Sequence, residues 1–455
     1  AYGPECGGKI KLHWLAVRQC YVKNRFSATP HTQGLTRQQQ HSDFWQDELG
    51  EQTWRLIEHR LAQQGAGWHD YHLVPAHPWQ VKKLAPQLKH PLACKDIIDL
   101  GQAGDDYQAS ISVRTLINLS RPEKANIKLP LSMVNTSSLR TIEPHSISTA
   151  PVLSQWLSDI VNNDAFFQQQ APLVLLREYA GIRLQAPTES RDSKSQAGDA
   201  WVAQIDDKLG VIFRESLEQH QLSSQAVPFM ALAMHEQDDL PFIHAWIERY
   251  DCGPWLQQLI KTVVLPVWHL LVHHGIALEA HAQNMILIHD NGWPSKIVLR
   301  DFHESLEFVD AFVKNPEIAP DFLPLEACYR NAKPNQYYWM DSIEALRELI
   351  VDTLFVFNLT ELSHLMDSVY GFSEQQFWQQ VYLQLQAYQN NNNTPLQRLR
   401  EVDIYQQTIQ TESLLKRKLS ETKQQEFHHK IANSLAHKLV KETAVVSSTA
   451  PSHQY

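Results

Sequence analysis

The second half of the chain is dominated by apolar residues that recur at spacings of three and four positions. This spacing places apolar side chains on one face of a helix. It occurs in four segments, 243–250, 255–274, 342–362 and 374–389. The pattern therefore predicts a mainly helical second half.

The first half of the chain has shorter apolar segments. One helix is expected over 42–63, where apolar residues follow an approximate helical stripe. Strands are expected at 71–75, at 109–116 and 127–131, where apolar and polar residues alternate, and at 174–176. Strands in the first half and helices in the second are typical of an α+β protein that contains an antiparallel sheet.

Polar residues flank two apolar segments near the middle of the helical half. Glu279 and Asn284 precede the segment 285–288, and Asp301 follows the segment 297–299. If the two segments pair as strands, the three side chains surround one point, and their oxygens suit Mg²⁺ and the phosphates that it carries. An acid five residues before an Asn, with Asp-Phe after the second strand, is typical of a kinase-type catalytic hairpin. The alternative is a hairpin in which these residues only cap strands and turns.

Composition narrows the class of protein. A length of 455 residues exceeds what one core usually holds, and with 43% hydrophobic residues we expect two or three lobes. The formal net charge of -10 argues against a nucleic-acid-binding surface. The five cysteines form no CxxC pair, so they indicate neither a disulfide framework nor a zinc site and favour the cytoplasm. No apolar run approaches the roughly 18 to 20 residues of a membrane span.

Basic and hydroxyl side chains gather in one part of the first half. Ser112 and Arg114 lie two positions apart on a predicted strand, and so share a face, and Lys128 lies on the next strand. Thr136 and Arg140 follow in the connection. Guanidinium groups bind phosphate or carboxylate in a bidentate manner. Any one of these residues alone is more typical of a solvated sheet face, but together with the downstream hairpin they favour a polyanion site.

In this order along the chain, the motifs resemble those of the NRPS-independent siderophore synthetases, the IucA/IucC family that includes aerobactin and achromobactin synthetases. The matching motifs are His77-Pro78-Trp79-Gln80, Ser112-Val113-Arg114-Thr115, Lys128, Thr136-Ser137-Ser138-Leu139-Arg140, Glu279-Ala280-His281-Ala282-Gln283-Asn284 and Arg300-Asp301-Phe302. Each motif is short, but their combination and order are specific.

The resemblance implies a hand-like α+β fold with three lobes. These are the remainder of an N-terminal thumb over 1–65, a fingers lobe with an antiparallel sheet over 66–205, and a mainly helical palm with a kinase-like catalytic hairpin over 206–455. The family also carries a His-Pro-x-His-Pro-type motif just upstream of the segment matching Tyr2-Gly3-Pro4-Glu5, and it is missing here. We therefore expect an N-terminally truncated chain.

The implied activity is that of a cytoplasmic, ATP-dependent ligase of siderophore biosynthesis. It would adenylate a carboxylate of citrate or a related acid and transfer the acyl group to an amine or hydroxyl nucleophile, with release of AMP and pyrophosphate. ATP and Mg²⁺ are the implied cofactors, and a homodimer is expected, with neither nucleic acid nor membrane as a partner. No residue distinguishes which acid or which nucleophile is used.

The resemblance also assigns residue roles, in three groups. The ATP phosphates and the activated carboxylate would be held by Ser112, Arg114, Lys128, Thr136 and Arg140; the shared pocket would be lined by His281 and Gln283; the metal would be held by Glu279, Asn284 and Asp301. Arg114, Arg140 and His281 are the catalytic candidates. The guanidiniums would stabilise charge that builds up on phosphate, and His281 would accept the proton of the amine or have a purely binding role.

Two other functions fit part of the pattern. A small-molecule kinase of the aminoglycoside-phosphotransferase type would use Glu279 in place of its usual aspartate, but the chain has no Gly-rich loop ahead of its strands. An inactive remnant that binds nucleotide or acid is the third possibility. Among the other histidines, His77 is expected in a helix cap or a buried hydrogen bond. His273 and His274 occupy adjacent helical positions that do not share a face, and no role is predicted for them.

Overall fold

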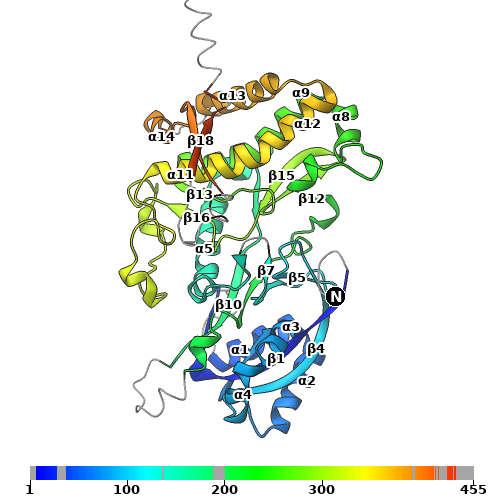
Figure 1. The fold of residues 1–455 in the computed structure, drawn as a ribbon, viewed down its shortest axis with the longest axis vertical. Coiled ribbons are helices and arrows are strands. Elements are labelled where there is room, and N and C mark those ends of the chain that lie inside the picture. Colours follow the sequence, from blue (N-terminus) through cyan, green and yellow to red (C-terminus); the bar gives the residue numbers. More distant parts are fainter. Residues whose placement is uncertain are drawn as a thin grey trace, which may run out of the picture.

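The protein is described here from a computed structural model, in which it forms an elongated molecule with two parts (Figure 1). The residues that the structure describes are 7–27, 37–135, 138–187, 200–391, 395–413 and 428–433, together with residues 416, 419, 435 and 436. The lower part in Figure 1 is built on a large sheet, whereas the upper part is mainly helical and contains a smaller sheet. The expected mixture of helices and an antiparallel sheet is confirmed.

The large sheet has eight antiparallel strands in the order β2-β10-β11-β6-β5-β4-β1-β3. Its strands are β1 (Ile10–Arg18), β2 (Val22–Phe26), β3 (Tyr71–Ala76), β4 (Ile97–Ala109), β5 (Thr115–Asn118), β6 (Asn126–Lys128), β10 (Glu178–Leu184) and β11 (Gly210–Arg214). β4 is long and curved (Figure 1), because its pairing with β1 shifts register twice, at Gly101 and Gly104, which have positive φ angles. The sheet is therefore curled.

Helices α1 (Arg37–Leu49) and α2 (Glu51–Gln63) pack on this sheet with a core rich in tryptophan. Trp14 of β1, Trp45 of α1 and Trp54 of α2 are all buried. The expectation of a single helix over 42–63 is wrong, because Gly50 between the two helices has a φ of 74°. That left-handed conformation is accessible to glycine and ends the first helix.

Helix α3 (Pro78–Lys83) begins at the residue after His77. The Nδ1 atom of His77 accepts the backbone N–H of Trp79 at 3.0 Å, so His77 is the N-cap of this helix. The expectation of a capping role for His77 is confirmed.

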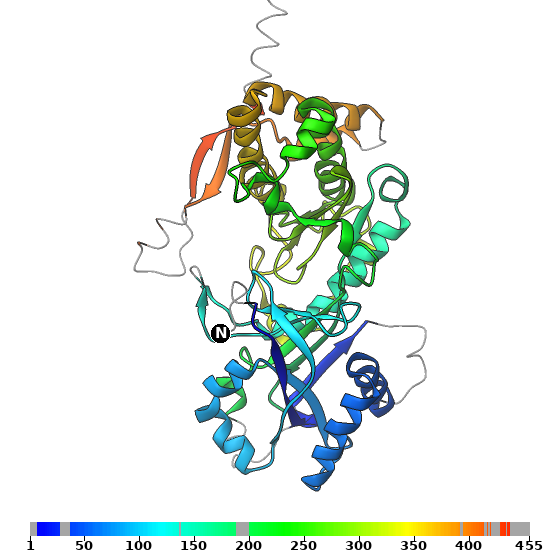
Figure 2. The same ribbon diagram turned by 90° about the vertical axis from the view of Figure 1, so that its right-hand side faces the viewer.

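Helix α5 (Pro144–Asn163) connects the two parts of the molecule. Its first half packs on β10, where a Cβ atom at Gly181 would lie 2.1 Å from the carbonyl oxygen of Ile147. Its second half carries Leu153 and Trp156 into the core of the upper part. Figures 1 and 2 show α5 running from the large sheet toward the helices above it.

The smaller sheet has the order β12-β14-β15-β9. Its strands are β12 (Ala226–Pro228), β14 (Met285–Asp290), β15 (Trp293–Leu299) and β9 (Leu173–Leu175). β14 and β15 form an antiparallel hairpin, and β9 lies parallel to β15. The predicted hairpin and the strand at 174–176 are thereby confirmed.

The upper part contains two long continuous helices, Cys252–His274 and Ile343–Tyr370. Its helical segments are α8 (His244–Tyr250), α9 (Cys252–Leu259), η7 (Ile260–Val264), α10 (Leu265–His269), η8 (Leu270–His274), α11 (Ile343–Ile350), η11 (Val351–Leu359), α12 (Thr360–Tyr370), α13 (Glu374–Asn391) and α14 (Leu396–Val402), of which η7, η8 and η11 are π-helical. The four predicted helical segments of this half are confirmed.

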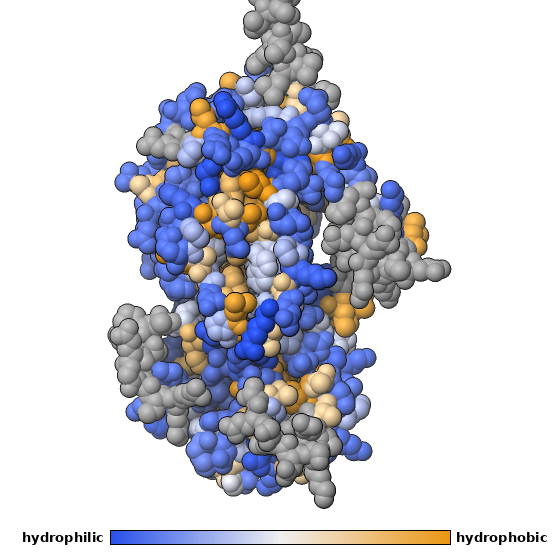
Figure 3. Space-filling model, turned by 90° about the vertical axis from the view of Figure 1, so that its left-hand side faces the viewer, coloured by the Kyte–Doolittle hydropathy of each residue, from blue (hydrophilic) through white to orange (hydrophobic). Residues whose placement is uncertain are grey.

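Both long helices are apolar enough to cross a membrane, but they lie in the core. In their most apolar windows, 83% and 61% of the residues are buried inside the protein. The face shown in Figure 3 is predominantly hydrophilic, with apolar side chains in separate small patches. Burial of this kind is the behaviour of core helices.

The remaining α-helices and strands of the described residues are short. They are α4 (Ala85–Ala93), α6 (Ala165–Gln169), β7 (Val134–Asn135), β8 (Ser138–Leu139), β13 (Ile276–Leu278), β16 (Leu306–Phe308), β17 (Thr408–Glu412) and β18 (His428–Ala432). Strand pairing crosses the predicted boundary at residue 65, since β1 pairs with β3 and β4, and β2 pairs with β10. The division into lobes over 1–65, 66–205 and 206–455 stays a prediction.

Candidate active site

The hairpin of β14 and β15 brings the predicted metal ligands together at its open end. Asn284 immediately precedes β14 and Asp301 follows β15, and the backbone N–H of Arg300 donates to the carbonyl oxygen of Asn284 at 3.2 Å. Glu279 follows β13, and the Asn284 side-chain amide donates to the Glu279 carbonyl oxygen at 3.1 Å. The three residues therefore meet where β13 and the hairpin adjoin.

Negative charge is concentrated at this point. Burial, together with repulsion from Glu304 and Asp301, raises the pKa of Glu279 to about 7.

The backbone of Asp301 has a φ of 64°, which is uncommon for a residue other than glycine. Backbone strain of this kind clusters at functional sites.

Two buried cations from the large sheet neutralise Asp301. Lys128 ends β6 and Arg214 ends β11, and these two strands are neighbours. Lys128 Nζ lies 3.2 Å and Arg214 Nη1 2.9 Å from Oδ1 of Asp301. Burial by itself would raise the pKa of Asp301, but the two cations hold it well below its ordinary value. The large sheet thus supplies the positive side of the site, and the hairpin supplies the negative side.

Two further guanidinium groups adjoin these residues. Arg114 Nη2 lies 3.3 Å from Oε2 of Glu304, and Arg114 Nη1 donates to the carbonyl oxygen of Thr141. Burial, followed by the nearby charge of Arg114, lowers the pKa of Arg140. Arg114 and Arg140 therefore lie in one region, with Glu304 close to both.

The strand expected over 109–116 is not formed, which changes the placement of two predicted residues. β4 ends at Ala109 and β5 begins at Thr115, and Val113 between them has a φ of 56°. Ser112 and Arg114 therefore lie in a tight turn, not on one face of a strand. The Ser112 hydroxyl accepts the backbone N–H of Thr115 at 3.1 Å, so Ser112 holds this turn. The prediction of one strand was wrong because apolar and polar residues keep alternating through the turn that joins β4 to β5.

Thr136 lies outside the described residues. Of the other predicted binding residues, His281 and Gln283 lie in the turn before β14. The Nδ1 atom of His281 accepts the backbone N–H of Gln283 at 3.1 Å, and its Nε2 atom lies 3.8 Å from Oε1 of Glu279. The carbonyl oxygen of Gln283 accepts two hydrogen bonds from Arg300, at 2.7 and 3.1 Å.

Sequence reasoning missed several residues that the structure places in this site. They are Glu178, Arg214, His303 and Glu304. His303 is fully buried, its Nδ1 atom lies 2.5 Å from Oε1 of Glu178, and its Nε2 atom lies 3.0 Å from Nζ of Lys128. His303 and Glu304 directly follow Asp301-Phe302, so extending that motif by two residues would have included them. Glu178 and Arg214 depend on the order of strands in the sheet.

The donor groups of this site fit an oxyanion ligand. The Nε atoms of Arg114 and Arg214 are buried and make no hydrogen bond among the residues that the structure describes. A buried donor without an acceptor is costly, and a guanidinium group binds phosphate or carboxylate well. The carboxylates of Glu279 and Asp301 and the amide of Asn284 offer the hard oxygens that Mg²⁺ prefers.

Comparison with known proteins gives two family matches. Residues 1–234 match the model of the IucA / IucC family, and residues 254–427 match the model described as ferric iron reductase FhuF-like transporter. The first match covers the large sheet with its helices, and the second covers most of the helical part.

The chain is similar to a Bacillus anthracis protein named citryl-spermidine/3,4-dihydroxybenzoyl-citryl-spermidine:spermidine ligase. The two are 36% identical over 421 residues, which cover 92% of this chain and 65% of that protein. This chain therefore spans just under two thirds of that relative's length.

Two solved structures are similar over nearly the whole chain. The petrobactin biosynthesis protein AsbB from Bacillus anthracis str. Sterne superposes with a TM-score of 0.85 and 33% identity, over 98% of this chain and 71% of that one. The aerobactin synthetase IucC from a hypervirulent pathotype of Klebsiella pneumoniae gives a TM-score of 0.77 and 25% identity, over 96% of this chain and 71% of that one.

Proposed function

Because this chain belongs to the IucA/IucC family, we propose that it is an ATP-dependent ligase of siderophore biosynthesis. Its acid substrate would be citrate or a citrate-like acid, and its nucleophile an amine or a hydroxyl compound. The name of the Bacillus anthracis relative, with its citryl and spermidine groups, favours an amine. The observation that carries the proposal is a set of cations that pair with carboxylates at the end of the hairpin. Lys128 and Arg214 are buried and pair with Asp301, and Arg114 is partly buried and pairs with Glu304.

The proposed reaction has two steps. In the first, a carboxylate oxygen of the acid attacks the α-phosphorus of ATP and pyrophosphate leaves, which gives an acyl-adenylate. In the second, the amine nitrogen attacks the acyl carbon, AMP leaves, and the nitrogen loses a proton. The product is an amide; a hydroxyl nucleophile would give an ester by the same route.

The first step brings two anions together, so it requires positive charge where negative charge builds up. Lys128 and Arg214 emerge from neighbouring strands, and Arg114 and Arg140 lie beside them. Together they would hold the phosphates of ATP and the carboxylate that is activated. Arg214 joins the set because of its place beside Lys128, and Ser112 supports it by holding the turn that carries Arg114.

The residues fit the Mg²⁺ ion that accompanies ATP. Crowding of Glu279 by Glu304 and Asp301 is the repulsion that a divalent cation would remove. We propose that Glu279, Asn284 and Asp301 hold this ion, which would supply charge neutralisation for the phosphates.

His281 is better placed to donate a hydrogen bond than to accept a proton. Its Nδ1 atom already accepts the N–H of Gln283, so the proton of the neutral ring lies on Nε2. That N–H would bind an anionic oxygen of the substrate. Gln283 would help to shape the same pocket, since its backbone fixes both His281 and Arg300.

The finer description of the fold and the assembly is also proposed. We propose the hand-like arrangement of thumb, fingers and palm, with the active site between the sheet and the helical part. A cytoplasmic homodimer is proposed from the family. The relatives reported above are named as ligase, synthetase and biosynthesis protein, which gives the kinase and the inactive remnant no support.

The proposal is tested by incubating the chain with Mg-ATP, citrate and a panel of polyamines, and identifying both the nucleotide and the organic product. AMP and pyrophosphate that form only with citrate present, together with a citryl amide, are expected. Hydroxylamine in place of the polyamine should capture the acyl-adenylate as a hydroxamate. ADP as the product, or AMP release without need for an acid, would contradict the proposal.

A further inference from the structure

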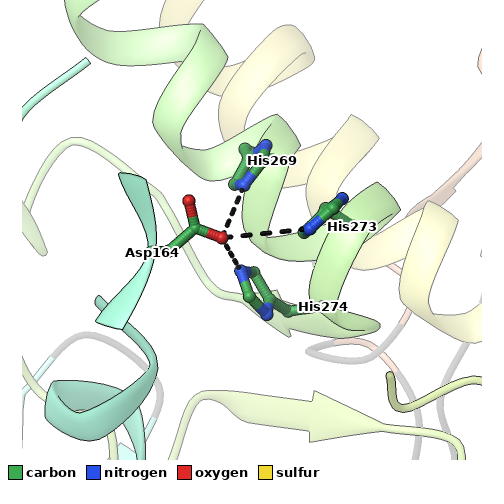
Figure 4. A group of neighbouring side chains, drawn as sticks. All are labelled: Asp164, His269, His273 and His274. Carbon is green, nitrogen blue, oxygen red and sulfur yellow. Dashed lines mark hydrogen bonds and ion pairs between the residues drawn. The ribbon is translucent and has the colours of Figure 1, made fainter. Parts of the chain in front are cut away.

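A second cluster of titratable side chains lies in the upper part of the molecule. Figure 4 shows Asp164, between α5 and α6, facing three histidines of the helix over Cys252–His274. Oδ2 of Asp164 lies 3.2 Å from Nε2 of His269, 3.9 Å from Nε2 of His273 and 2.8 Å from Nε2 of His274. His269 and His274 are buried, and Asp164 and His273 are partly buried. None of these residues belongs to the candidate active site.

The helix geometry explains why the three histidines share a face. The last turn, η8 (Leu270–His274), is π-helical, so its hydrogen bonds join residues five positions apart. In this wider turn, both His273 and His274 come round to the side of His269. The expectation that the adjacent pair faces different sides is wrong for this reason. Single π-helical turns inside α-helices are frequent at functional sites.

The distances suit a tetrahedral metal ion. Zinc binds imidazole nitrogen and carboxylate oxygen at about 2.0–2.2 Å, which places two ligands about 3.3 Å from each other. The three Asp164 to histidine distances, from 2.8 to 3.9 Å, bracket this value. All four ligand atoms lie within 4.8 Å of one another.

The ligand atoms are also fixed in orientation. Nδ1 of His269 lies 2.6 Å from the hydroxyl oxygen of Tyr388, so an Nδ1–H that donates to this oxygen leaves Nε2 available as a ligand. Oδ1 of Asp164 accepts the N–H of Phe166 at the start of α6, which turns Oδ2 toward the histidines. Burial lowers the pKa of His269 to about 3 and that of His274 to about 4, so both rings are in the neutral form that binds metals.

Hydrogen bonds alone explain this cluster less well. His269 and His274 then share one carboxylate oxygen, and Nε2 of His273 stays 3.9 Å from it, beyond hydrogen-bonding distance. The other oxygen already accepts the N–H of Phe166 in α6. Lys314, whose side chain is exposed, also contacts Nε2 of His273. A metal ion would displace this ammonium group into solvent and give all four side chains a common partner.

We propose that Asp164, His269, His273 and His274 form a metal-binding site for a divalent transition-metal ion, with Zn²⁺ as the ion that this ligand set fits best. Four protein ligands leave no open position, which is the mark of a structural site. The ion would fasten the end of α5, which comes from the large sheet, to the long helix beside the hairpin. This site does not depend on the proposed ligase activity.

The test is the metal content and the metal affinity of the untagged chain. Protein purified without chelator is analysed by inductively coupled plasma mass spectrometry, and chelator-treated protein is titrated with Zn²⁺ in competition with a chromophoric chelator. We expect about one zinc ion per chain, and a rise in the thermal unfolding temperature when Zn²⁺ is restored. Replacement by Co²⁺ should give the intense visible absorption of a tetrahedral complex.

Variants locate the ion. His273→Gln alters the most exposed of the three histidines and should fold normally while weakening Zn²⁺ binding by more than about 100-fold. Tyr388→Phe should weaken binding by about 10- to 100-fold, because it removes the hydrogen bond that orients His269. His59→Gln, an exposed histidine on α2, is the matched control and should leave the affinity unchanged.

Two results would overturn the proposal. One is a wild-type chain that neither retains Zn²⁺ nor changes its unfolding temperature when Zn²⁺ is added. The other is a stoichiometric zinc ion whose affinity is the same in wild type and in folded His273→Gln and Tyr388→Phe, because the ion would then lie elsewhere.

Discussion

Asp301 is the residue on which the charges of the candidate active site converge. It follows the hairpin in a left-handed backbone conformation, and its carboxylate binds Lys128 and Arg214. Of the two cations, Arg214 is the better residue to substitute. It is almost fully buried, and part of its guanidinium group has no hydrogen-bond partner among the described residues. Its charge is therefore available to a ligand.

Replacing Arg214 with Gln should lower kcat by about 10²- to 10³-fold, because one preorganised positive group is lost where negative charge develops. It should also lower the free energy of unfolding by about 3–5 kcal/mol, since a buried ion pair is broken. Steady-state kinetics and urea denaturation measure the two effects.

Arg183→Gln is the matched control for this variant. Arg183 makes a similarly buried ion pair with Glu326, at 2.6 Å, outside the site. We expect a comparable loss of stability and an unchanged kcat. Equal losses of kcat in both variants would show that Arg214 acts only through stability.

Glu279 should make stability fall as the pH rises. Its pKa is about 7 in the folded protein and near its ordinary value when unfolded. Between these two values the folded state binds more protons, so the free energy of unfolding decreases with increasing pH. Glu279→Gln should remove this decrease, so that the variant gains stability relative to wild type from about pH 5 to about pH 8.

Urea denaturation over that pH range measures the effect. Glu344→Gln is the contrast, because the hydrogen bond from Arg347 lowers the pKa of Glu344. The carboxyl of Glu344 is therefore ionised in both the folded and the unfolded state over this range, and the stability difference between that variant and wild type should stay nearly constant from about pH 5 to about pH 8. An unchanged difference between Glu279→Gln and wild type at every pH would show that Glu279 is not crowded by its neighbours.

At this scale the sequence predicts only the residues that lie in contiguous motifs. Glu279, Asn284 and Asp301 could be grouped because the hairpin joins Asn284 to Asp301, and Glu279 lies only five residues before Asn284. Arg214 and Glu178 could not, because their place depends on the pairing of β11 with β6 and of β10 with β11. Strand order in a sheet carries no local signal.

At the scale of elements, the close contact between α5 and β10 can be tested by a single substitution. Gly181 allows the backbone of α5 to approach so closely that an added methyl group would meet the carbonyl oxygen of Ile147 at 2.1 Å. Gly181→Ala should therefore destabilise the protein by about 1–3 kcal/mol or more, as overpacking does. Chemical denaturation of the variant measures the loss.

Gly253→Ala serves as the control for this substitution. An added Cβ there meets no atom within 4 Å, and the residue lies in the first turn of α9. Stability should stay the same or rise by up to about 1 kcal/mol. If Gly181→Ala is equally harmless, α5 does not press on the sheet as described.

Periodicity predicts the elements well where apolar residues recur at spacings of three and four throughout a segment, as in the four helices of the second half. It fails at the positions where single residues set the backbone. Gly50 divides the segment 42–63 into two helices, and Val113 turns the chain within 109–116. The π-helical turn at Leu270–His274 changes which side chains share a face, and an assumed 3.6-residue period cannot show it.

For the molecule as a whole, two predictions from the sequence agree with the structure. The α+β class follows from the separation of strands and helices along the chain, and the smaller sheet follows from the hairpin. The curled eight-stranded sheet does not, because it combines strands from residues 10–26 with strands as distant as 210–214. Only folding of the chain places Lys128 and Arg214 opposite the hairpin.

In the ligand-free protein, Asp301 occupies the cations that a phosphate would bind, and Lys128 and Arg214 occupy the carboxylate that a metal ion would bind. A polyphosphate that binds Lys128 and Arg214 must separate them from Asp301, which leaves the carboxylates of Asp301, Glu279 and Glu304 without a compensating charge. A divalent ion that binds Asp301 without the polyphosphate must separate Asp301 from the same two buried cations. Each ligand alone meets an opposing charge cost, and the two together exchange partners with little net change. Nucleotide and metal should consequently bind with positive cooperativity, so that each binds more weakly in the absence of the other.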